Sequence, residues 1–238
     1  MKAVILAGGR GTRLYPYTVV FPKPLVPIGD KPIIEIMLQQ LQRAGIEDIT
    51  ISVGHLAELL MAFLGDGQKF GVRIEYVRED EPLGTVGPLR LIKDLPEHFL
   101  LMNGDVLTDL DYGQLFRAHV AGAAAVSIAT YRRNVAIDLG VLVAKDGLLT
   151  EYIEKPTHIF DVSMGVYALN RSVLELIPAG VYFDFPMLIH TLLARGEPVR
   201  SYPFNGIWLD IGRAADYEEA QKTFASLREK ILPGGRPG

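Results

Sequence analysis

The chain of 238 residues contains no cysteine, a single tryptophan and no long run of apolar residues. Without cysteine it cannot form disulfide bonds or thiolate metal sites, which agrees with a reducing cytosol. No apolar run approaches the ~18 residues that a membrane span needs. The start, MKAVILAGG, is too short for the apolar core of a signal peptide, and Gly-Arg follows where a cleavage site would stand. We therefore expect a soluble, cytoplasmic protein with no membrane partner.

Acidic residues are missing from the first 29 positions, although the whole chain has a net charge of −4. Four of the 24 basic residues lie in that stretch, so the rest of the chain sums to −8. Nucleic acid requires an extended basic face, whereas one basic loop on an acidic protein suits a small polyanion. The charge distribution therefore argues against a nucleic-acid partner.

Apolar strands and amphipathic helices alternate along the chain. Segment 2–7 (KAVILA) is typical of a buried parallel strand, and segment 32–45 places its apolar side chains on one helical face. The same patterns predict strands at 48–54, 72–77, 98–105, 123–131 and 162–170, and helices at 56–65, 84–95, 112–122, 171–177, 185–195 and 213–230. A hairpin is expected around Asp146-Gly147.

Repetition of strand and helix with short connections predicts an α/β fold. We expect a Rossmann-like, three-layer αβα sandwich whose central sheet is mixed but mainly parallel. One domain is expected over 1–230, with a nucleotide-binding part at about 1–110 and a sugar-phosphate-binding part at about 111–230. Residues 231–238 (ILPGGRPG) are expected to form a disordered tail.

The stretch LAGGRGTRLYPYTVVFPKPL (6–25) follows the first predicted strand and combines glycines with cationic residues. Glycines expose backbone N–H groups that suit phosphate oxygens, although an ordinary turn with surface charges is the simpler reading. A P-loop is excluded because Thr12-Arg13 follows Gly11 where Lys-Ser/Thr is needed. The dinucleotide fingerprint fails as well, because Leu14 replaces its third glycine and Gly54-His55 replaces its acid. A nicotinamide oxidoreductase is therefore disfavoured.

A longer pattern does match. The stretch LAGGRGTRLYPYTVVFPKPLVPIGDKP resembles the signature of the sugar-1-phosphate nucleotidylyltransferases, the nucleoside-diphosphate-sugar pyrophosphorylases. The resemblance continues through EPLGTVGPL (81–89), NGD (103–105), EKP (154–156) and WLDIG (208–212), and covers roughly residues 1–225. It implies a GT-A-like fold and transfer of a nucleotidyl group from an NTP to a sugar-1-phosphate, with release of pyrophosphate.

The resemblance also implies roles for particular residues. Nucleotide binding falls to Leu6, Ala7, Gly8, Gly9, Gly11, Thr12, Arg13, Lys23, Gly84 and Thr85. Among these, Arg13 would hold the β- and γ-phosphates, and Lys23 would lie between the α-phosphate and the incoming phosphate. Arg13, Lys23 and Asp105 form the catalytic set. The family needs no general base, because a phosphate monoester with a second pKa of about 6 is largely ionised at pH 7.

Asp105 and Asp210 resemble the family's metal pair, and two carboxylates with phosphate oxygens and waters suit Mg²⁺. The sugar phosphate would contact Asn103, Gly140, Glu154, Lys155 and Ser163. Ser163 departs from the family pattern, because asparagine usually stands there, and this marks a different sugar contact. Larger relatives carry a carboxy-terminal β-helix, and we expect neither its acyl transfer nor its regulation here.

The base and the oligomeric state are left open by the sequence. The form Pro-Leu-Gly-Thr (82–85) is most like mannose-1-phosphate guanylyltransferases and favours GTP over UTP, then CTP or dTTP. A uridylyl-, thymidylyl- or cytidylyltransferase is therefore the alternative, and a non-catalytic nucleotide or sugar-phosphate sensor is a remote one. The expected partners are an NTP and a sugar-1-phosphate, and a homodimer is compatible with the sequence.

Overall fold

The computed structural model describes residues 1–212 and 214–232. A sheet of seven strands crosses the molecule in the order β12-β8-β11-β6-β1-β4-β5. Its strands are β1 (Lys2–Ala7), β4 (Asp48–Val53), β5 (Arg73–Arg78), β6 (His98–Asn103), β8 (Val126–Ala136), β11 (Thr157–Asn170) and β12 (Val199–Phe204). All of them run parallel except β11, which is antiparallel to β6 and β8. The prediction of a mixed, mainly parallel sheet is confirmed.

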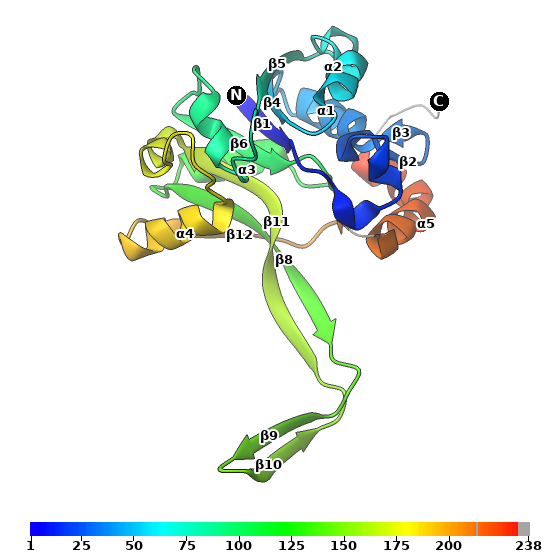
Figure 1. Ribbon diagram of the computed structural model, residues 1–238, viewed down its shortest axis with the longest axis vertical. Coiled ribbons are helices and arrows are strands. Elements are labelled where there is room, and N and C mark those ends of the chain that lie inside the picture. The colour runs from blue at the N-terminus through cyan, green and yellow to red at the C-terminus, as the bar shows by residue number, and fades with distance from the viewer. Residues whose placement is uncertain (213, 233–238) are drawn as a thin grey trace.

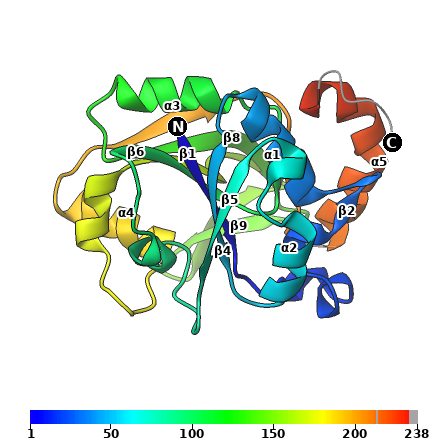
Figure 2. The ribbon, with the colours of Figure 1, turned by 90° about the horizontal axis from the view of Figure 1, so that it is seen from above.

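Helices cover both faces of this sheet (Figure 2). They are α1 (Ile33–Arg43), α2 (Ala57–Leu64), α3 (Tyr112–Val120), α4 (Phe185–Ala194) and α5 (Ala214–Ile231). Side chains alternate along β1, so that Ala3 and Ile5 join a core with α1, α2, α3 and α5, whereas Val4 joins a core with α4. The three-layer arrangement follows from this alternation.

Three short ribbons complete the strands. They are β2 (Pro27–Ile28) with β3 (Lys31–Pro32), β7 (Val106–Thr108) with β13 (Trp208–Asp210), and β9 (Val141–Lys145) with β10 (Leu148–Ile153). Short 3₁₀ turns are η1 (Thr12–Leu14), η2 (Tyr17–Val19), η3 (Lys23–Leu25), η4 (Gln68–Phe70), η5 (Gly87–Leu91) and η6 (Arg171–Leu176). The β7/β13 ribbon matters most for the site, because it joins two distant parts of the chain.

Two of the predicted helices are 3₁₀ turns instead. Segment 84–95 contains Gly84, Gly87 and Pro88, which lower helix propensity, and only η5 forms there. Segment 171–177 is too short for its hydrogen bonds to offset the free energy cost of helix nucleation, and it forms η6. The other predicted helices are present within about two residues of their expected bounds. Residues 213 and 233–238, and with them most of the expected tail, lie outside the described part; α5 runs to Ile231 and Leu232 is buried.

The strands β8 and β11 extend further than the sequence predicts. The expected strands at 123–131 and 162–170 are Val126–Ala136 and Thr157–Asn170 in the structure. Their added halves pair with each other beyond the sheet and lead to the β9/β10 hairpin, which projects from the body (Figure 1). In the part of the chain that the structure describes, no helix has the length and apolar character that crossing a membrane requires.

Candidate functional site

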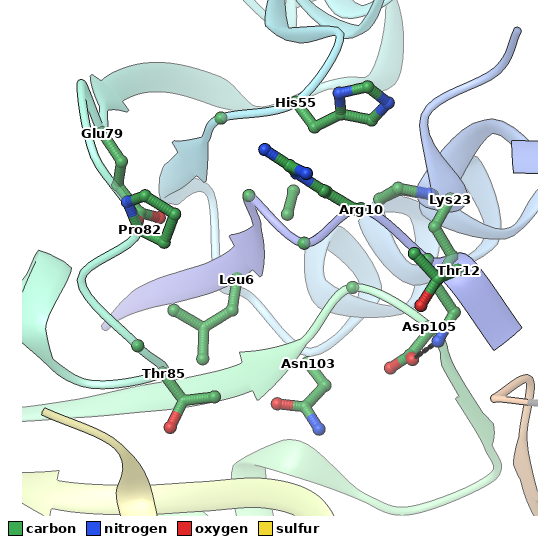
Figure 3. Close-up of a pocket in the computed structure, with 18 of the residues that line it drawn as sticks. Leu6, Arg10, Thr12, Lys23, His55, Glu79, Pro82, Thr85, Asn103 and Asp105 are labelled. Carbon is green, nitrogen blue, oxygen red and sulfur yellow. Dashed lines mark hydrogen bonds and ion pairs between the residues drawn. The ribbon is translucent and has the colours of Figure 1, made fainter. Parts of the chain in front are cut away.

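A cavity of about 780 Å³ lies where β1, β4, β5 and β6 end (Figure 3). Parallel strands of an open sheet bring their carboxyl ends to one edge, which is where ligands of such sheets bind. Every residue predicted for the nucleotide lines this cavity, together with Asn103 and Asp105: Leu6, Ala7, Gly8, Gly9, Gly11, Thr12, Arg13, Lys23, Gly84 and Thr85. We call this cavity the cleft.

The first wall of the cleft is backbone packed too closely for side chains. A Cβ atom on Gly8 would lie 2.6 Å from Oε1 of Glu79, and one on Gly54 would lie 2.9 Å from the carbonyl oxygen of Gly8. Glu79 is itself held, because it accepts hydrogen bonds from the Ser52 hydroxyl (2.7 Å) and from the backbone N–H of Leu83 (3.1 Å). Glycine therefore keeps the floor open for a ligand that approaches the backbone.

The loop after β1 is fixed by a few buried anchors while its cations stay exposed. Gly11 has a φ of +61°, and its carbonyl oxygen accepts a hydrogen bond of 2.8 Å from the Thr18 hydroxyl. Leu14 is fully buried, whereas Arg10 and Arg13 are exposed and line the cleft. Among the described residues neither arginine has an ion-pair partner. The loop thus presents two unpaired cations to the cleft.

Lys23 and Asp105 form an ion pair at one end of the cleft, opposite Pro82 and Thr85 (Figure 3). Lys23 lies in η3, where Pro22 and Pro24 restrict the backbone, and Asp105 follows the buried strand β6. Their side chains are only 13% and 17% exposed, so the pair is largely shielded from water. Oδ1 of Asp105 is buried and has no hydrogen-bond partner among the described residues.

Asp210 stands beside Asp105, although the two are far apart in the sequence. Strand β13 pairs with β7 so that Asp210 lies opposite Val106, and the backbone N–H of Ile211 donates to the carbonyl oxygen of Asp105 at 3.1 Å. Burial raises the pKa of Asp210, the Asp105 carboxylate raises it further, and Lys23 lowers it. The two predicted metal ligands therefore share one electrostatic environment.

Tyr167 on β11 is a neighbour that the sequence did not reveal. Its ring stacks on Phe185 at 3.7 Å between centroids, and its hydroxyl accepts a hydrogen bond of 3.1 Å from Ser163. Burial raises its pKa, and the carboxylates of Asp105 and Asp210 raise it further. The tyrosine is thus a neutral polar group beside the acidic pair. No local motif marks it, because β11 reaches the site through long-range antiparallel pairing.

Twelve other residues line the cleft and were not predicted: Arg10, Pro24, Gly54, His55, Arg78, Glu79, Asp80, Glu81, Pro82, Gly104, Tyr182 and Gly212. Those with charged side chains and His55 could have been found, since Arg10 lies inside the glycine-rich loop and the others follow the predicted strands at 48–54 and 72–77. Tyr182 carries no such signal. The missed residues include two arginines and three carboxylates, so the cleft lining carries as many anionic as cationic side chains.

The predicted sugar-phosphate residues are divided between two places. Asn103 lines the cleft, and Ser163 lies on β11 where its ladder with β8 is interrupted. Gly140, Glu154 and Lys155 directly flank the β9/β10 hairpin and are not part of the cleft lining. The Tyr152 hydroxyl donates to Glu154 at 2.9 Å, and the Lys155 ammonium pairs with Asp138 at 2.9 Å. These roles stay predictions.

Within residues 1–212 and 214–232, no group of three or more histidine, cysteine, aspartate or glutamate side chains could hold a metal ion. A cation in the cleft would therefore rely on the pair Asp105 and Asp210, with its remaining ligands from substrate and water. This matches the preference of Mg²⁺ for one or two carboxylates plus phosphate oxygens.

Comparison with known proteins identifies the class. The family model described as nucleotidyl transferase matches residues 2–226, and the chain belongs to this family.

The chain is 35% identical over 246 residues to a mannose-1-phosphate guanyltransferase of Yarrowia lipolytica, covering 98% of the chain and 66% of the relative. It is 33% identical over 267 residues to a UTP–glucose-1-phosphate uridylyltransferase of Synechocystis, covering 100% of the chain and 68% of that protein. The chain thus spans about two thirds of the length of these relatives.

A solved structure has the same fold. It is a Bacillus anthracis protein in complex with sucrose, described provisionally as a glucose-1-phosphate thymidylyltransferase. The TM-score is 0.75 at 26% identity, over 99% of this chain and 98% of the other. The expected GT-A-like architecture is thereby confirmed, whereas the relatives differ in the base that their names specify.

Proposed function

We propose that the protein transfers a nucleotidyl group from an NTP to a sugar-1-phosphate and releases pyrophosphate. An oxygen of the sugar phosphate attacks the α-phosphorus, the bond from that phosphorus to the bridging oxygen breaks, and pyrophosphate leaves with the electron pair. The observation that carries this proposal is the shielded Lys23–Asp105 pair at the end of a glycine-walled cleft, in a nucleotidyl transferase chain. A sugar phosphate is already ionised, so the reaction needs positioning and charge neutralisation rather than a base.

The cationic loop would hold the triphosphate. Gly9, Gly11 and Thr12 line the cleft, and backbone N–H groups that no large side chain covers suit phosphate oxygens. Arg13 is exposed and unpaired among the described residues, so it can neutralise the leaving pyrophosphate. Lys23 would lie where the α-phosphate and the attacking phosphate meet, reducing the repulsion between two anions. The chemistry is thus assigned to groups that already face one space.

Mg²⁺ fits the acidic side of the cleft. The buried Oδ1 of Asp105 lacks a partner among the described residues, and Asp210 beside it has a raised pKa because burial and Asp105 disfavour its charge. A divalent cation would satisfy both carboxylates and bind phosphate oxygens. When bound, it would supply charge neutralisation for the transferring phosphoryl group. Asp105 and Asp210 are the residues that would hold it.

GTP is the favoured nucleotide. Thr85 accepts a hydrogen bond of 2.6 Å from the backbone N–H of Phe185, and Gly84 has a φ of +80° with Phe183 close behind it. This rigid turn lies at the far end of the cleft from Lys23, where a base would be read. Several similar proteins are named mannose-1-phosphate guanyltransferases, but one is named a uridylyltransferase. Uridylyl, thymidylyl or cytidylyl transfer is the alternative.

Pyrophosphate release tests the proposal. The purified protein is incubated with Mg²⁺ and each of GTP, UTP, CTP, dTTP and ATP, against mannose-, glucose- and other sugar-1-phosphates. We expect release only when an NTP and a sugar-1-phosphate are both present, with GTP giving the highest kcat/KM. Asp105→Asn and Lys23→Ala should each lower kcat by roughly 10²- to 10³-fold.

A matched variant separates loss of chemistry from loss of fold. Lys222→Gln removes a cation from the exposed face of α5 and should leave kcat unchanged. Near-normal turnover of Asp105→Asn would contradict the mechanism. Binding of NTP without pyrophosphate release from any pair of substrates would instead indicate a sensor.

A further inference from the structure

Helix α5 packs beside the short strand β2, although the two come from opposite ends of the chain (Figure 1, Figure 2). The same helix contacts β13, the strand that ends at Asp210. Strand β2 begins at Pro27 and follows the η3 turn that carries Lys23. Helix α5 therefore lies against both the cationic and the acidic side of the cleft.

One face of α5 makes the contact with the β2/β3 ribbon. Its members recur at spacings of four, three and four residues, as one helical face requires: Tyr217, Gln221, Phe224 and Arg228. The ring of Phe224 lies so close to Gly29 that a Cβ atom there would be 2.9 Å from it. Arg228 pairs with Asp30 at 2.8 Å. Three of the four side chains carry polar atoms, so this face makes directional contacts as well as apolar ones.

The carbonyl oxygen of Pro27 is at the centre of these contacts. It accepts hydrogen bonds from the Tyr217 hydroxyl at 3.0 Å and from the Gln221 side-chain amide at 2.9 Å. The Gln221 amide also donates to the Tyr217 oxygen at 2.7 Å, and its own oxygen accepts from the backbone N–H of Gly29 at 3.0 Å. Two donors that converge on one carbonyl fix its direction as well as its distance from the helix.

Tyr217 also contacts the chain on the other side of Lys23. Its ring centroid lies 5.1 Å from that of Tyr17, with an interplanar angle of 56°. Tyr17 precedes Lys23 in the chain and Pro27 follows it, so one side chain holds both ends of the segment that carries the lysine. Tyr217 is only 7% exposed, which fixes the helix side of both contacts.

The segment 22–27 has little freedom of its own. It contains three prolines, which restrict the backbone. Within it, the backbone N–H groups of Leu25 and Val26 donate hydrogen bonds of 2.8 and 3.1 Å. A segment that is restricted in this way moves as a unit, so a displacement of Pro27 also displaces Lys23.

We propose that Tyr217 and Gln221 are positioning residues for Lys23. Their hydrogen bonds to the carbonyl oxygen of Pro27 set where the lysine ammonium lies relative to Asp105. Phosphoryl transfer depends on the placement of charge, and a displacement of about 1 Å can lower a rate by 10²-fold. The effect on catalysis rests on the proposed function, whereas the placement of Lys23 does not.

The kinetics of a double variant test the effect on catalysis. Tyr217→Phe with Gln221→Leu removes both hydrogen bonds to the Pro27 carbonyl and keeps a ring beside Tyr17. We expect kcat to fall by roughly 10-fold or more, with less than about a twofold change in KM for the NTP. The KM is retained because Arg13 and the glycine-rich loop would still hold the triphosphate.

The measurement is made well below the Tm of each variant, where circular dichroism shows a folded chain. Thr223→Val is the matched control, since the Thr223 hydroxyl donates to the carbonyl oxygen of Glu219 within α5 at 2.8 Å. This control should change neither kcat nor KM. If Tyr217 and Gln221 only stabilised the fold, the double variant would have a lower Tm and an unchanged kcat. That result would overturn the proposal.

A second comparison shows whether the effect passes through Lys23. The double variant is combined with Lys23→Ala, and its kcat is compared with that of Lys23→Ala alone. If Tyr217 and Gln221 act through the lysine, their removal has no further effect, whereas independent losses multiply. A difference of less than about twofold supports the proposal. A loss as large as in the wild-type background would contradict it.

Chemical acetylation tests the placement of Lys23 without turnover. Its ammonium is paired with Asp105 and its side chain is only 13% exposed, so acetylation of the wild type should be slow. In the double variant we expect the rate at Lys23, followed by peptide mass spectrometry, to rise several-fold. The exposed Lys93 should react as in the wild type.

Acetylation also separates the two proposals. An unchanged rate at Lys23 would overturn the positioning role even if turnover fell. Faster acetylation of Lys23 in the double variant of a protein that turns over no pair of substrates would keep the placement of Lys23 and remove the proposed function.

Discussion

At the scale of single residues, Asp210 carries a charge that the fold disfavours. Its carboxylate is partly buried next to that of Asp105, and its pKa is raised by burial first and by Asp105 second. A raised pKa means that the charged form is less favourable in the folded chain than in the unfolded chain. Above that pKa, the ionised Asp210 therefore destabilises the fold, and the Mg²⁺ that we propose would relieve this.

We expect Asp210→Asn to raise the Tm of the protein in EDTA at pH 7, because the amide removes this unfavourable charge. The same variant should lose most of the increase in Tm that Mg²⁺ gives the wild type. For the wild type, binding of Mg²⁺ should weaken as the pH falls through the raised pKa, since protonation removes the ligand charge. Thermal scans with and without Mg²⁺ measure both effects. A lower Tm for Asp210→Asn in EDTA would contradict the argument.

The same scale shows what the sequence revealed of the site. Gly8, Gly9 and Gly11 follow one predicted strand, so the local pattern indicated a phosphate-binding turn, and the family resemblance placed Lys23 with them; all four line the cleft. The placement of Asp210 beside Asp105 came from a family resemblance, because no local pattern joins residues in β7 and β13. Tyr167 was missed altogether, since only the register of β11 brings it there.

At the scale of elements, helix α3 is attached to the sheet by a buried histidine. His119 is fully buried, and its Nδ1 lies 2.9 Å from the hydroxyl of Ser127 on β8. The pKa of His119 is lowered to about 4, chiefly by burial and also by the neighbouring groups His98 and Arg200. The unfolded chain takes up this proton near pH 6.5, whereas the folded chain does so only near pH 4.

Stability should consequently be independent of His119 above pH 6.5 and fall as the pH drops from 6.5 towards 4. The loss amounts to roughly 1–3 kcal/mol. His119→Gln removes the titration, so its free energy of unfolding should decline less over that window than that of the wild type. Urea denaturation at several pH values measures this. His190→Gln, on the exposed surface of α4, is the control and should follow the wild type. Equal slopes for His119→Gln and the wild type would refute the prediction.

Elements themselves were predicted well where their signal is local. Segment 2–7, which two glycines follow, was predicted as a strand and matches β1. The helical spacing of the apolar side chains in α1 predicted the face that this helix buries. The lengths of β8 and β11 were not predictable, because residues 132–136 and 157–161 pair with each other outside the core and carry mixed polarity. Local sequence states which residues prefer a strand, but not where the strand leaves the sheet.

At the scale of the whole molecule, cations gather in the loop after β1. The first 29 residues carry four cations and no anion, and the remainder sums to −8. Arg10 and Arg13 lie on this loop and line the cleft, whereas the carboxylates of the lining come from segment 79–81 and from Asp105. A loop that concentrates one sign of charge increases the local concentration of an oppositely charged substrate. The acidic surface elsewhere repels the same anion, so productive encounters are directed to the loop.

This steering predicts a dependence on salt. Arg10→Gln should lower kcat/KM for the NTP several-fold at 20 mM salt, and the difference from the wild type should shrink at ~0.5 M, where the Debye length is below about 5 Å. Lys93→Gln changes the net charge equally, but Lys93 is exposed and precedes the start of β6, at the opposite edge of the sheet from the cleft. If steering is local, only the arginine variant responds, because the field near the cleft decides capture. Equal effects of both substitutions would instead attribute the salt dependence to net charge.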